Sequence, residues 1–242
     1  MNILDKIEGP KDLKDLNIKE LELLCDDIAT LIKTTIEDKG GHYSSPLGVI
    51  ELTVALHYVY NSPIDKLIWD VGHQAYPHKI LTGRKNIFST LRQKDGISGF
   101  LKIDESAHDA FGAGHSSTSI SAGLGFAHAR DKDNKNHQVL SIIGDGAMTG
   151  GMAYEGMNNL GFHKTQLTVV LNDNSLSISK SVGALSKYLT LITTNRTYNK
   201  MRKNIWSISG KIPFISKSLR YLLKKIEKTL KVSLTAGSFF ED

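Results

Sequence analysis

Apolar positions recur at helical spacing in two segments near the N-terminus. In residues 17–39 they fall on one face of a helix: Leu21, Leu24, Ile28, Leu31 and Ile32. Asn17, with Glu20 three positions later, is an N-capping arrangement, and Gly40-Gly41 ends the pattern. A second apolar stretch covers residues 47–60 and ends near Pro63. We therefore predict one helix over residues 17–39 and another over residues 47–60.

Three short apolar runs, bounded by Gly, Pro or Asn, have the composition of buried strands. They cover residues 66–71, 139–143 and 167–171. Residues 148–160, between the last two runs, have a helix-compatible composition, so strand, helix and strand form a βαβ unit. The predicted fold class is α/β, with a parallel sheet flanked by helices.

Ligands of such sheets bind outside the carboxyl ends of the strands. The residues that follow the three predicted strands are glycine or polar: Gly72-His73-Gln74, Gly144-Asp145-Gly146 and Asn172-Asp173-Asn174. Because parallel strands end at the same edge of a sheet, we expect these three loops to lie close together there.

The composition limits the class of protein. A chain of 242 residues with 40% hydrophobic content is long enough for one substantial domain, which we take to span residues 1–242. The single Cys25 excludes an internal disulfide framework and a Cys-based zinc site, and it fits a helix position better than a nucleophile. The N-terminus has no apolar signal region and no Arg-rich transit character, and no apolar run approaches about 20 residues. These features predict a cytoplasmic protein.

Positive charge is concentrated in residues 187–234. Between Lys187 and Lys231 there are twelve Lys and Arg and one acidic residue, Glu227, whereas the rest of the chain is acidic. We interpret this basic segment as largely helical or mobile, with residues 215–234 packed on the domain and their Lys side chains in solvent. Contact with a membrane surface or nucleic acid is the alternative. We expect neither a membrane nor a specific nucleic acid as partner.

A candidate metal site follows the second predicted strand. Asn174 stands 29 positions after Asp145, and Mg²⁺ prefers oxygen ligands, which Asp145, Asn174 and a carbonyl near Leu176 can supply. Gly144 and Gly146 let the backbone turn sharply and approach phosphate oxygens. A helix that begins beyond Ala147 would point its positive end at the same anion. A tight turn explains Gly144-Asp145-Gly146 alone equally well, but with Asn174 the spacing resembles the thiamine-diphosphate motif.

Five blocks, in order, extend this resemblance over nearly the whole chain. They are Gly40-Gly41-His42 and residues 47–57, 69–84, 111–122 and 144–149. Together they resemble the deoxyxylulose-phosphate synthase family. Transketolases share the general layout, but not the block over residues 73–84.

The resemblance implies a thiamine-diphosphate-binding fold and a role for each site residue. His42 and His73 would be the catalytic histidines. The cofactor would contact His73, Gly114, His115, Ser116, Gly146, Ala147 and Asn174. Mg²⁺ would bind to Asp145, Asn174 and Leu176. The implied reaction condenses pyruvate with glyceraldehyde 3-phosphate and releases CO₂, the first step towards isoprenoid precursors and a supply of thiamine and pyridoxal, in a homodimer.

A physical argument that does not depend on the resemblance also supports a catalytic role for His42 and His73. Carboligation moves protons near neutral pH, where imidazole titrates. We expect His57, on an apolar helix face, to be a core residue, and His128, His137 and His163 to be surface residues. His73 and His78 lack the spacing of two zinc ligands on one helical turn. Gly112-Ala113-Gly114 is an incomplete dinucleotide fingerprint, since Ser117 stands where the third glycine would be.

Members of the resembled family are longer, and their second domain provides a glutamate for the cofactor's aminopyrimidine ring. This sequence stops at Phe239-Phe240-Glu241-Asp242. We therefore expect an incomplete domain with weak cofactor binding, no carboligation by the chain alone, and exposed apolar surface near Ile142, Val170 and Ile178. The alternatives are the N-terminal subunit of a split transketolase-like enzyme, and a catalytically silent domain that binds a cofactor, a partner or nucleic acid.

Overall fold

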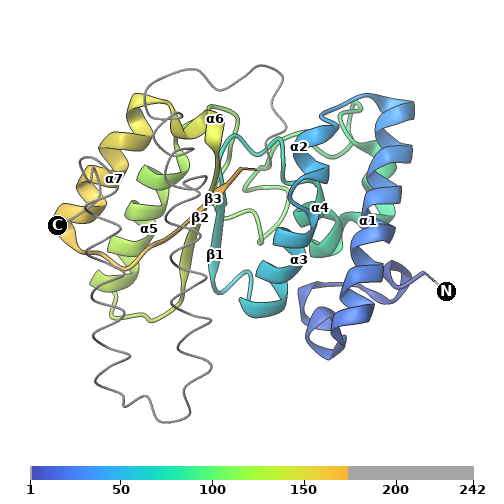
Figure 1. Cartoon of the computed structure of the whole chain (residues 1–242), viewed down its shortest axis with the longest axis horizontal. Helices are drawn as coiled ribbons and strands as arrows, with labels where there is room; N and C mark the ends of the chain where they lie inside the picture. Colours follow the sequence, from blue (N-terminus) through green and yellow to red (C-terminus); the bar gives the residue numbers. More distant parts are fainter. Residues whose placement is uncertain (1, 174–242) are drawn as a thin grey trace, which may run out of the picture. The chain divides into compact units, whose positions relative to one another are not determined.

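Three parallel strands form the central sheet (Figure 1). The computed structural model describes residues 2–173, which include β1 (Lys66–Trp69), β2 (Val139–Gly144) and β3 (Thr168–Asn172), in the order β1-β2-β3. Trp69 pairs with Ile142 and Gly144 pairs with Asn172, so the strands end at the same edge. The predicted parallel sheet is confirmed.

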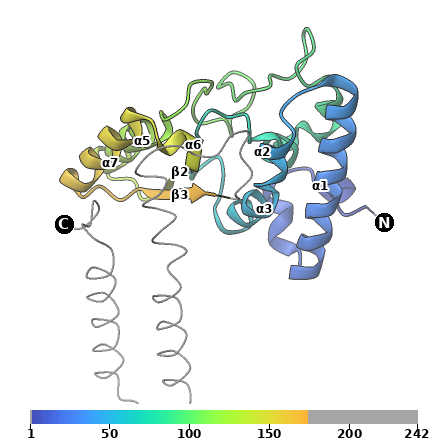
Figure 2. The same cartoon turned by 45° about the horizontal axis from the view of Figure 1, so that its top comes forward.

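Helices cover both faces of this sheet, and the strand side chains alternate between them. On one side lie α1 (Ile18–Lys39), α2 (Ser44–Leu47), α3 (Ile50–Val59) and α4 (Tyr76–Lys79), and on the other lie α5 (Ser119–Lys132) and α7 (Gly151–His163) (Figures 1 and 2). Leu67, Trp69 and Leu140 pack with Leu56 of α3. Ile68 and Val139 pack with Ala127 of α5. The α/β class is therefore confirmed.

The expectation that apolar surface is exposed near Ile142 is wrong for Ile142 itself. Its side chain is fully buried, because β2 is the middle strand of the sheet and is covered on both faces. Val170, on the outer strand β3, is half-buried, and Ile178 lies outside the described residues.

The N-terminal helix follows its sequence signals. Two short 3₁₀ turns, η1 (Leu4–Lys6) and η2 (Pro10–Asp15), precede α1. The Asn17 side chain accepts the N–H of Glu20, the Glu20 carboxylate accepts the N–H of Asn17, and Gly40 ends the helix with a φ of 73°. This predicted helix is confirmed, and Ile28 and Ile32 are buried on its inner face.

The predicted helix over residues 47–60 is wrong at its start. α2 ends at Leu47, and α3 begins only at Ile50. Gly48 and Val49 lie between the two helices and have non-helical backbone angles, with ψ of 2° and 11° respectively. The apolar pattern runs through this break because Val49 is itself buried, so periodicity alone does not reveal it.

The predicted helix over residues 148–160 is also wrong at its start. A short helix, α6 (Asp145–Met148), begins at Asp145 and not beyond Ala147, and α7 begins at Gly151. Gly150, between them, has an extended backbone. A Cβ at Gly150 would lie 2.1 Å from the Oγ of Ser117, so this joint depends on the absence of a side chain.

The part of the chain between β1 and α5 is mostly irregular. After α4 come two further turns, η3 (Ile80–Arg84) and η4 (Lys85–Thr90). Residues 91–118, hereafter the connecting segment, contain no helix and no strand. None of the helices in residues 2–173 has the length and apolarity to cross a bilayer. The basic segment 187–234 lies outside the described residues.

Candidate functional site

A tight turn follows β1. The N–H of Gly72 donates to the carbonyl of Asp70 at 2.6 Å, so Val71 is the central residue of a γ-turn, with a φ of 60°. This conformation is unfavourable for a β-branched residue, and it ends β1 before the predicted residue 71. A Cβ at Gly72 would lie 3.0 Å from that of Ala113 and 3.2 Å from the backbone nitrogen of Leu101. The turn thus places Gly72, next to His73, against the connecting segment.

The buried carboxylate of Asp70 joins this turn to the start of α5. Its Oδ1 accepts the N–H of Ser117 at 2.7 Å, and its Oδ2 accepts the N–H of Ser119 at 2.9 Å. Both bonds satisfy backbone donors at the N-terminus of a helix. The sequence indicates Asp70 only as part of the block over residues 69–84 and predicts no role for it. A carboxylate at the end of a buried strand was the available signal.

Ser117 in turn joins the Gly114-His115-Ser116 turn to α6. Its hydroxyl donates to the carbonyl of Ala147 at 2.7 Å. Two sets of predicted cofactor contacts, one before α5 and one after β2, are therefore neighbours in space. Gly114, His115, Ser116 and Gly146 are exposed, and a Cβ at Gly114 or Gly146 would meet no atom within 4 Å in the described structure. Among the described residues, no side chain blocks the approach of a ligand to these two glycines.

His42 and His73 lie together although they are far apart in the sequence. Their ring centroids are 5.2 Å apart, and both residues are partly exposed. The ring of Phe100, from the connecting segment, packs edge-on against His42 with a centroid distance of 5.8 Å. The Tyr76 hydroxyl accepts the backbone N–H of His42 and lies 3.4 Å from its Nδ1. Neither Phe100 nor Tyr76 was singled out from the sequence.

Burial makes both histidines weaker bases than a free imidazole. It lowers the pKa of His42, and the positive charge of Arg92 lowers it further. Burial and the neighbouring His42 lower the pKa of His73, against the opposing effect of Asp70. Both rings are therefore neutral at pH 7. Burial also raises the pKa of Tyr76, so its hydroxyl keeps the proton that it can donate to Nδ1 of His42.

Only part of the predicted metal site falls within the described residues. Asp145 is half-buried at the start of α6, and the pairing of Gly144 with Asn172 places the ends of β2 and β3 side by side. Asn174 and Leu176, the other predicted ligands, lie outside residues 2–173. Within that range no group of three or more His, Cys, Asp and Glu residues is arranged to bind a metal ion.

Four other histidines and Cys25 were predicted to have no part in the chemistry. His57 is fully buried, as predicted, and His128 and His163 are exposed, whereas His137 is partly buried. Burial, with a contribution from Glu51, raises the pKa of Cys25 to about 11. A thiol of such high pKa has little thiolate at neutral pH, which agrees with a helix residue rather than a nucleophile.

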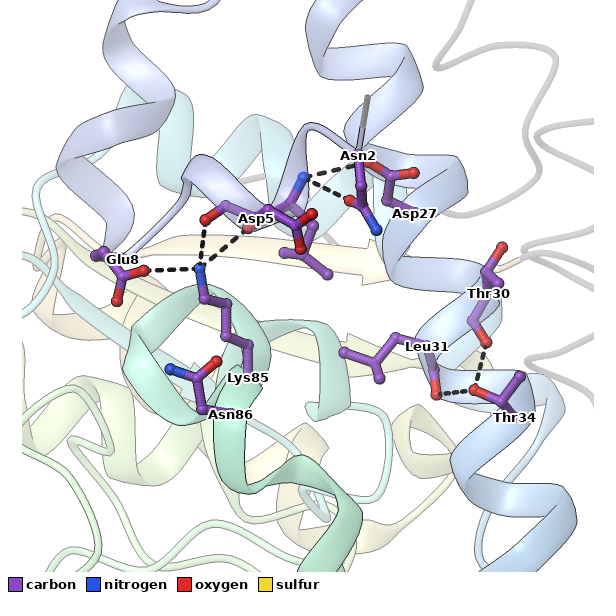
Figure 3. A pocket seen from close by; sticks show the side chains of 10 residues that line it. Asn2, Asp5, Glu8, Asp27, Thr30, Leu31, Thr34, Lys85 and Asn86 are labelled. Carbon is purple, nitrogen blue, oxygen red and sulfur yellow. Dashed lines mark hydrogen bonds and ion pairs between the residues drawn. The ribbon is translucent and has the colours of Figure 1, made fainter.

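A cavity of about 490 Å³ lies away from these residues, beside the N-terminal turns (Figure 3). Lys85 donates there to the carbonyls of Leu4 and Asp5 and to the carboxylate of Glu8 at 2.8 Å. None of the predicted site residues lines it. Its polar groups bond to one another and join the N-terminus to η4.

Comparison with known proteins identifies the family of the chain. The family model for 1-deoxy-D-xylulose-5-phosphate synthase matches residues 4–242, which include every predicted site residue. The chain belongs to the 1-deoxy-D-xylulose-5-phosphate synthase family.

Three bacterial members of the 1-deoxy-D-xylulose-5-phosphate synthase family illustrate the similarity. The chain is 52% identical to the synthase of Halothermothrix orenii over 241 residues and 51% identical to that of Caldanaerobacter subterraneus subsp. tengcongensis over 240 residues. It is 50% identical to that of Chlorobaculum tepidum over 240 residues. The matches cover 99–100% of this chain and 38–39% of these relatives, so the chain spans about two fifths of their length.

Proposed function

We propose that this chain forms the diphosphate-binding part of a thiamine-diphosphate-dependent transferase that condenses pyruvate with glyceraldehyde 3-phosphate and releases CO₂. The observation that supports it best is the Ser117 bond to Ala147. This bond places the Gly114-His115-Ser116 turn beside Gly146 and Ala147. Bound thiamine diphosphate would supply the chemistry at the substrate carbonyl carbon, and the chain would bind and orient it.

The residues present fit this cofactor. No described residue obstructs the backbone at Gly114 and Gly146, as binding of diphosphate oxygens requires. The Nδ1 of His73 is buried and has no hydrogen-bond partner among residues 2–173, so a ligand group can satisfy it. His115 and Ser116 are exposed beside the same turn. These residues, with Ala147 and Asn174, form the proposed cofactor contacts.

We extend the proposal to Mg²⁺, with Asp145, Asn174 and the carbonyl of Leu176 as protein ligands. A divalent cation would neutralise the diphosphate, and carboxylate, amide and carbonyl oxygens suit it. In an active enzyme completed by fusion to the remaining part of a relative, Asp145→Ala should weaken Mg²⁺-dependent cofactor binding by about tenfold or more. Calorimetry with thiamine diphosphate and Mg²⁺ measures this. Asp133→Ala, at an exposed position, is the control, and unchanged affinity in Asp145→Ala would remove Asp145 from the site.

His42 and His73 are the proposed catalytic histidines. As neutral imidazoles at pH 7 they can accept a proton from a reacting hydroxyl or donate one. His42→Ala should lower turnover by about 100-fold if His42 transfers a proton. A loss below about threefold would give His42 a structural role only.

The activity itself is tested with a joined protein. The chain is fused to the portion of the Halothermothrix orenii synthase that its match does not cover, and is supplied with thiamine diphosphate, Mg²⁺, pyruvate and glyceraldehyde 3-phosphate. We expect CO₂ and a deoxyketose phosphate, and no turnover by the 242-residue chain alone. A folded fusion that binds the cofactor but uses only ketose phosphates as donors would favour the split transketolase. Cofactor binding without turnover would favour the silent domain.

Three further predictions from the sequence belong to the same proposal: the single domain and the location rest on composition, and the dimer rests on the family resemblance. The chain acts as a single domain over residues 1–242, the enzyme is a homodimer, and it works in the cytoplasm. Sedimentation of the fusion protein tests the dimer, and cell fractionation tests the location.

A further inference from the structure

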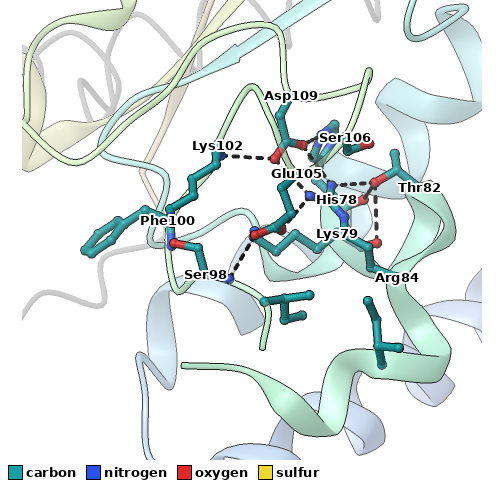
Figure 4. A network of polar contacts seen from close by, with 12 residues as sticks. His78, Lys79, Thr82, Arg84, Ser98, Phe100, Lys102, Glu105, Ser106 and Asp109 are labelled. Carbon is teal, nitrogen blue, oxygen red and sulfur yellow. Dashed lines mark hydrogen bonds and ion pairs between the residues drawn. The ribbon is translucent and has the colours of Figure 1, made fainter. Parts of the chain in front are cut away.

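The connecting segment supplies two parts of the candidate site, Phe100 and the Gly114-His115-Ser116 turn, yet it has no helix or strand to fix its position. A buried cluster of charged side chains joins it to α4 and η3 (Figure 4). The cluster comprises Lys79, Arg84, Glu105 and Asp109, and His78 borders it.

Arg84 is the centre of this cluster. Its two terminal nitrogens donate to the two carboxylate oxygens of Asp109, each at 2.8 Å, and one of them also donates to Glu105 at 2.8 Å. Lys79 donates to the same oxygen of Glu105. Lys79, Arg84 and Asp109 are almost completely buried. Two cations and two anions therefore balance inside the protein, as buried charges require.

Each of the two carboxylates also accepts a backbone N–H close to Phe100, one on either side of that residue. Glu105 accepts the N–H of Ser98 at 2.9 Å through its other oxygen, and Asp109 accepts the N–H of Lys102 at 3.2 Å. Ser98 and Lys102 each stand two positions from Phe100. The carboxylates thus fix the chain directly before and directly after the ring that packs on His42.

Two buried histidines complete the surroundings of Asp109. The Nε2 of His78 lies 3.3 Å from Asp109, and the Nδ1 of His78 lies 2.9 Å from the Nε2 of His57. His78 can donate to the carboxylate from Nε2 and accept from His57 at Nδ1 only when its own ring is neutral, and His57 must then carry a proton at Nε2. Burial lowers the pKa of both histidines, in agreement with this arrangement.

We infer that Glu105 and Asp109 are positioning residues for His42: through Ser98 and Lys102 they hold the Phe100 ring on the imidazole. Their consequence for catalysis rests on the proposed function, whereas their effect on Phe100 and His42 does not. Displacement of a site group by about 1 Å can cost about 100-fold in rate. Loss of one backbone bond should therefore lower turnover well beyond its effect on stability.

Glu105→Gln in the 242-residue chain tests the positional effect without cofactor. We expect the Ser98 amide to exchange with solvent at least about tenfold faster. The imidazole resonances of His42 should shift towards those of Phe100→Leu, which removes the ring. Glu8→Gln is the matched control, because it makes the same change at a carboxylate that is exposed and bonded to Lys85. Equal exchange and equal His42 resonances in Glu105→Gln and Glu8→Gln would overturn the inference.

Glu105→Asp decides the question if Glu105→Gln does not fold. It keeps the buried charge and shortens only the reach to Ser98, so the same faster exchange and the same His42 shift are expected. In the active fusion, Glu105→Asp should lower kcat about tenfold or more, with a smaller effect on KM. A shifted His42 with unchanged kcat would overturn the catalytic role, and an inactive parent fusion would count against the proposed function alone.

Discussion

The imidazoles of His42 and His73 lie 5.2 Å apart, partly buried, with the cation Arg92 acting on the first of them. Burial is the larger cause of the lowered pKa in each ring. Arg92 is exposed, and its stem packs near Gly99, next to Phe100. Its charge is therefore a separable contribution to the basicity of His42.

Arg92→Gln should raise the pKa of His42, because removal of a nearby positive charge makes protonation easier. The pKa should stay below its ordinary value, since burial remains. Titration of the His42 resonances by NMR measures the change, and Lys94→Gln, at an exposed cation of the same segment, is the control. In the active fusion, the acid limb of the rate profile should move to higher pH. An unchanged or lower pKa would contradict the role of Arg92.

The individual site residues were only partly predictable. The sequence indicated His42, His73 and the two glycine turns through motifs with local spacing. It gave no role to Asp70, Tyr76, Phe100 or Arg92, because each acts through a contact with a residue distant in the chain, such as Asp70 with Ser117. The roles of Asn174 and Leu176 remain predictions.

At the scale of elements, strands and capped helices were predictable and interruptions were not. β2 is an apolar run interrupted only by the buried Ser141, because it is covered on both faces, and α1 begins with a capping box. The break between α6 and α7 has one local signal, the adjacent Gly150 and Gly151, which the helix-compatible composition of residues 148–160 obscures. Its cause is tertiary, because Ser117 occupies the space where a side chain of residue 150 would lie.

Gly150→Ala should therefore damage the joint between α6 and α7. The added methyl would lie 2.1 Å from the Oγ of Ser117, and overpacking of this kind costs about 1–3 kcal/mol. Urea unfolding measures the loss, and in the fusion protein the affinity for thiamine diphosphate should fall as the Ser117 bond to Ala147 is displaced. Gly151→Ala is the matched control, because a Cβ there meets nothing within 4 Å. Equal stability of the two variants would contradict the close approach.

Across residues 2–173 as a whole, several histidine side chains are buried together with the apolar core. His57 and His78 are fully buried, and His108, bonded to the Ser62 hydroxyl at 2.9 Å, is half-buried. Burial lowers the pKa of all three histidines, that of His108 to about 4. Burial alone would raise the pKa of Asp109, but hydrogen bonds from His78 and Arg84, together with the charge of Arg84, keep it well below its usual range.

These histidines predict how stability depends on pH. In the unfolded chain they titrate near pH 6.5, so below that pH the unfolded state binds more protons than the folded state. The free energy of unfolding should fall as the pH drops from about 6.5 towards 4, by up to about 1.4 kcal/mol per pH unit for each proton taken up. Asp109 does not contribute to this pH dependence. Its stabilising effect is constant over the range, because it is lost only below the ordinary carboxyl pKa.

Urea unfolding at pH 7.5, 6.0 and 5.0 measures this dependence, and His108→Gln should flatten it. A free energy of unfolding that is constant or rises over this range would show that the buried histidines are already protonated in the folded state.

The pairing of β1 with β2 has a consequence for synthesis on the ribosome. Lys66 pairs with Val139, so about 70 residues must be made after β1 before its first partner strand exists. At about 5–20 residues per second, this interval lasts about 4–15 s. Until α5 has been made, the apolar residues Leu67, Ile68 and Trp69 can pack only against the N-terminal helices and the segment that follows β1. A nascent chain stalled before residue 139 should therefore contain the helical cluster around α1 and an unpaired β1, and should bind chaperones that recognise apolar strands.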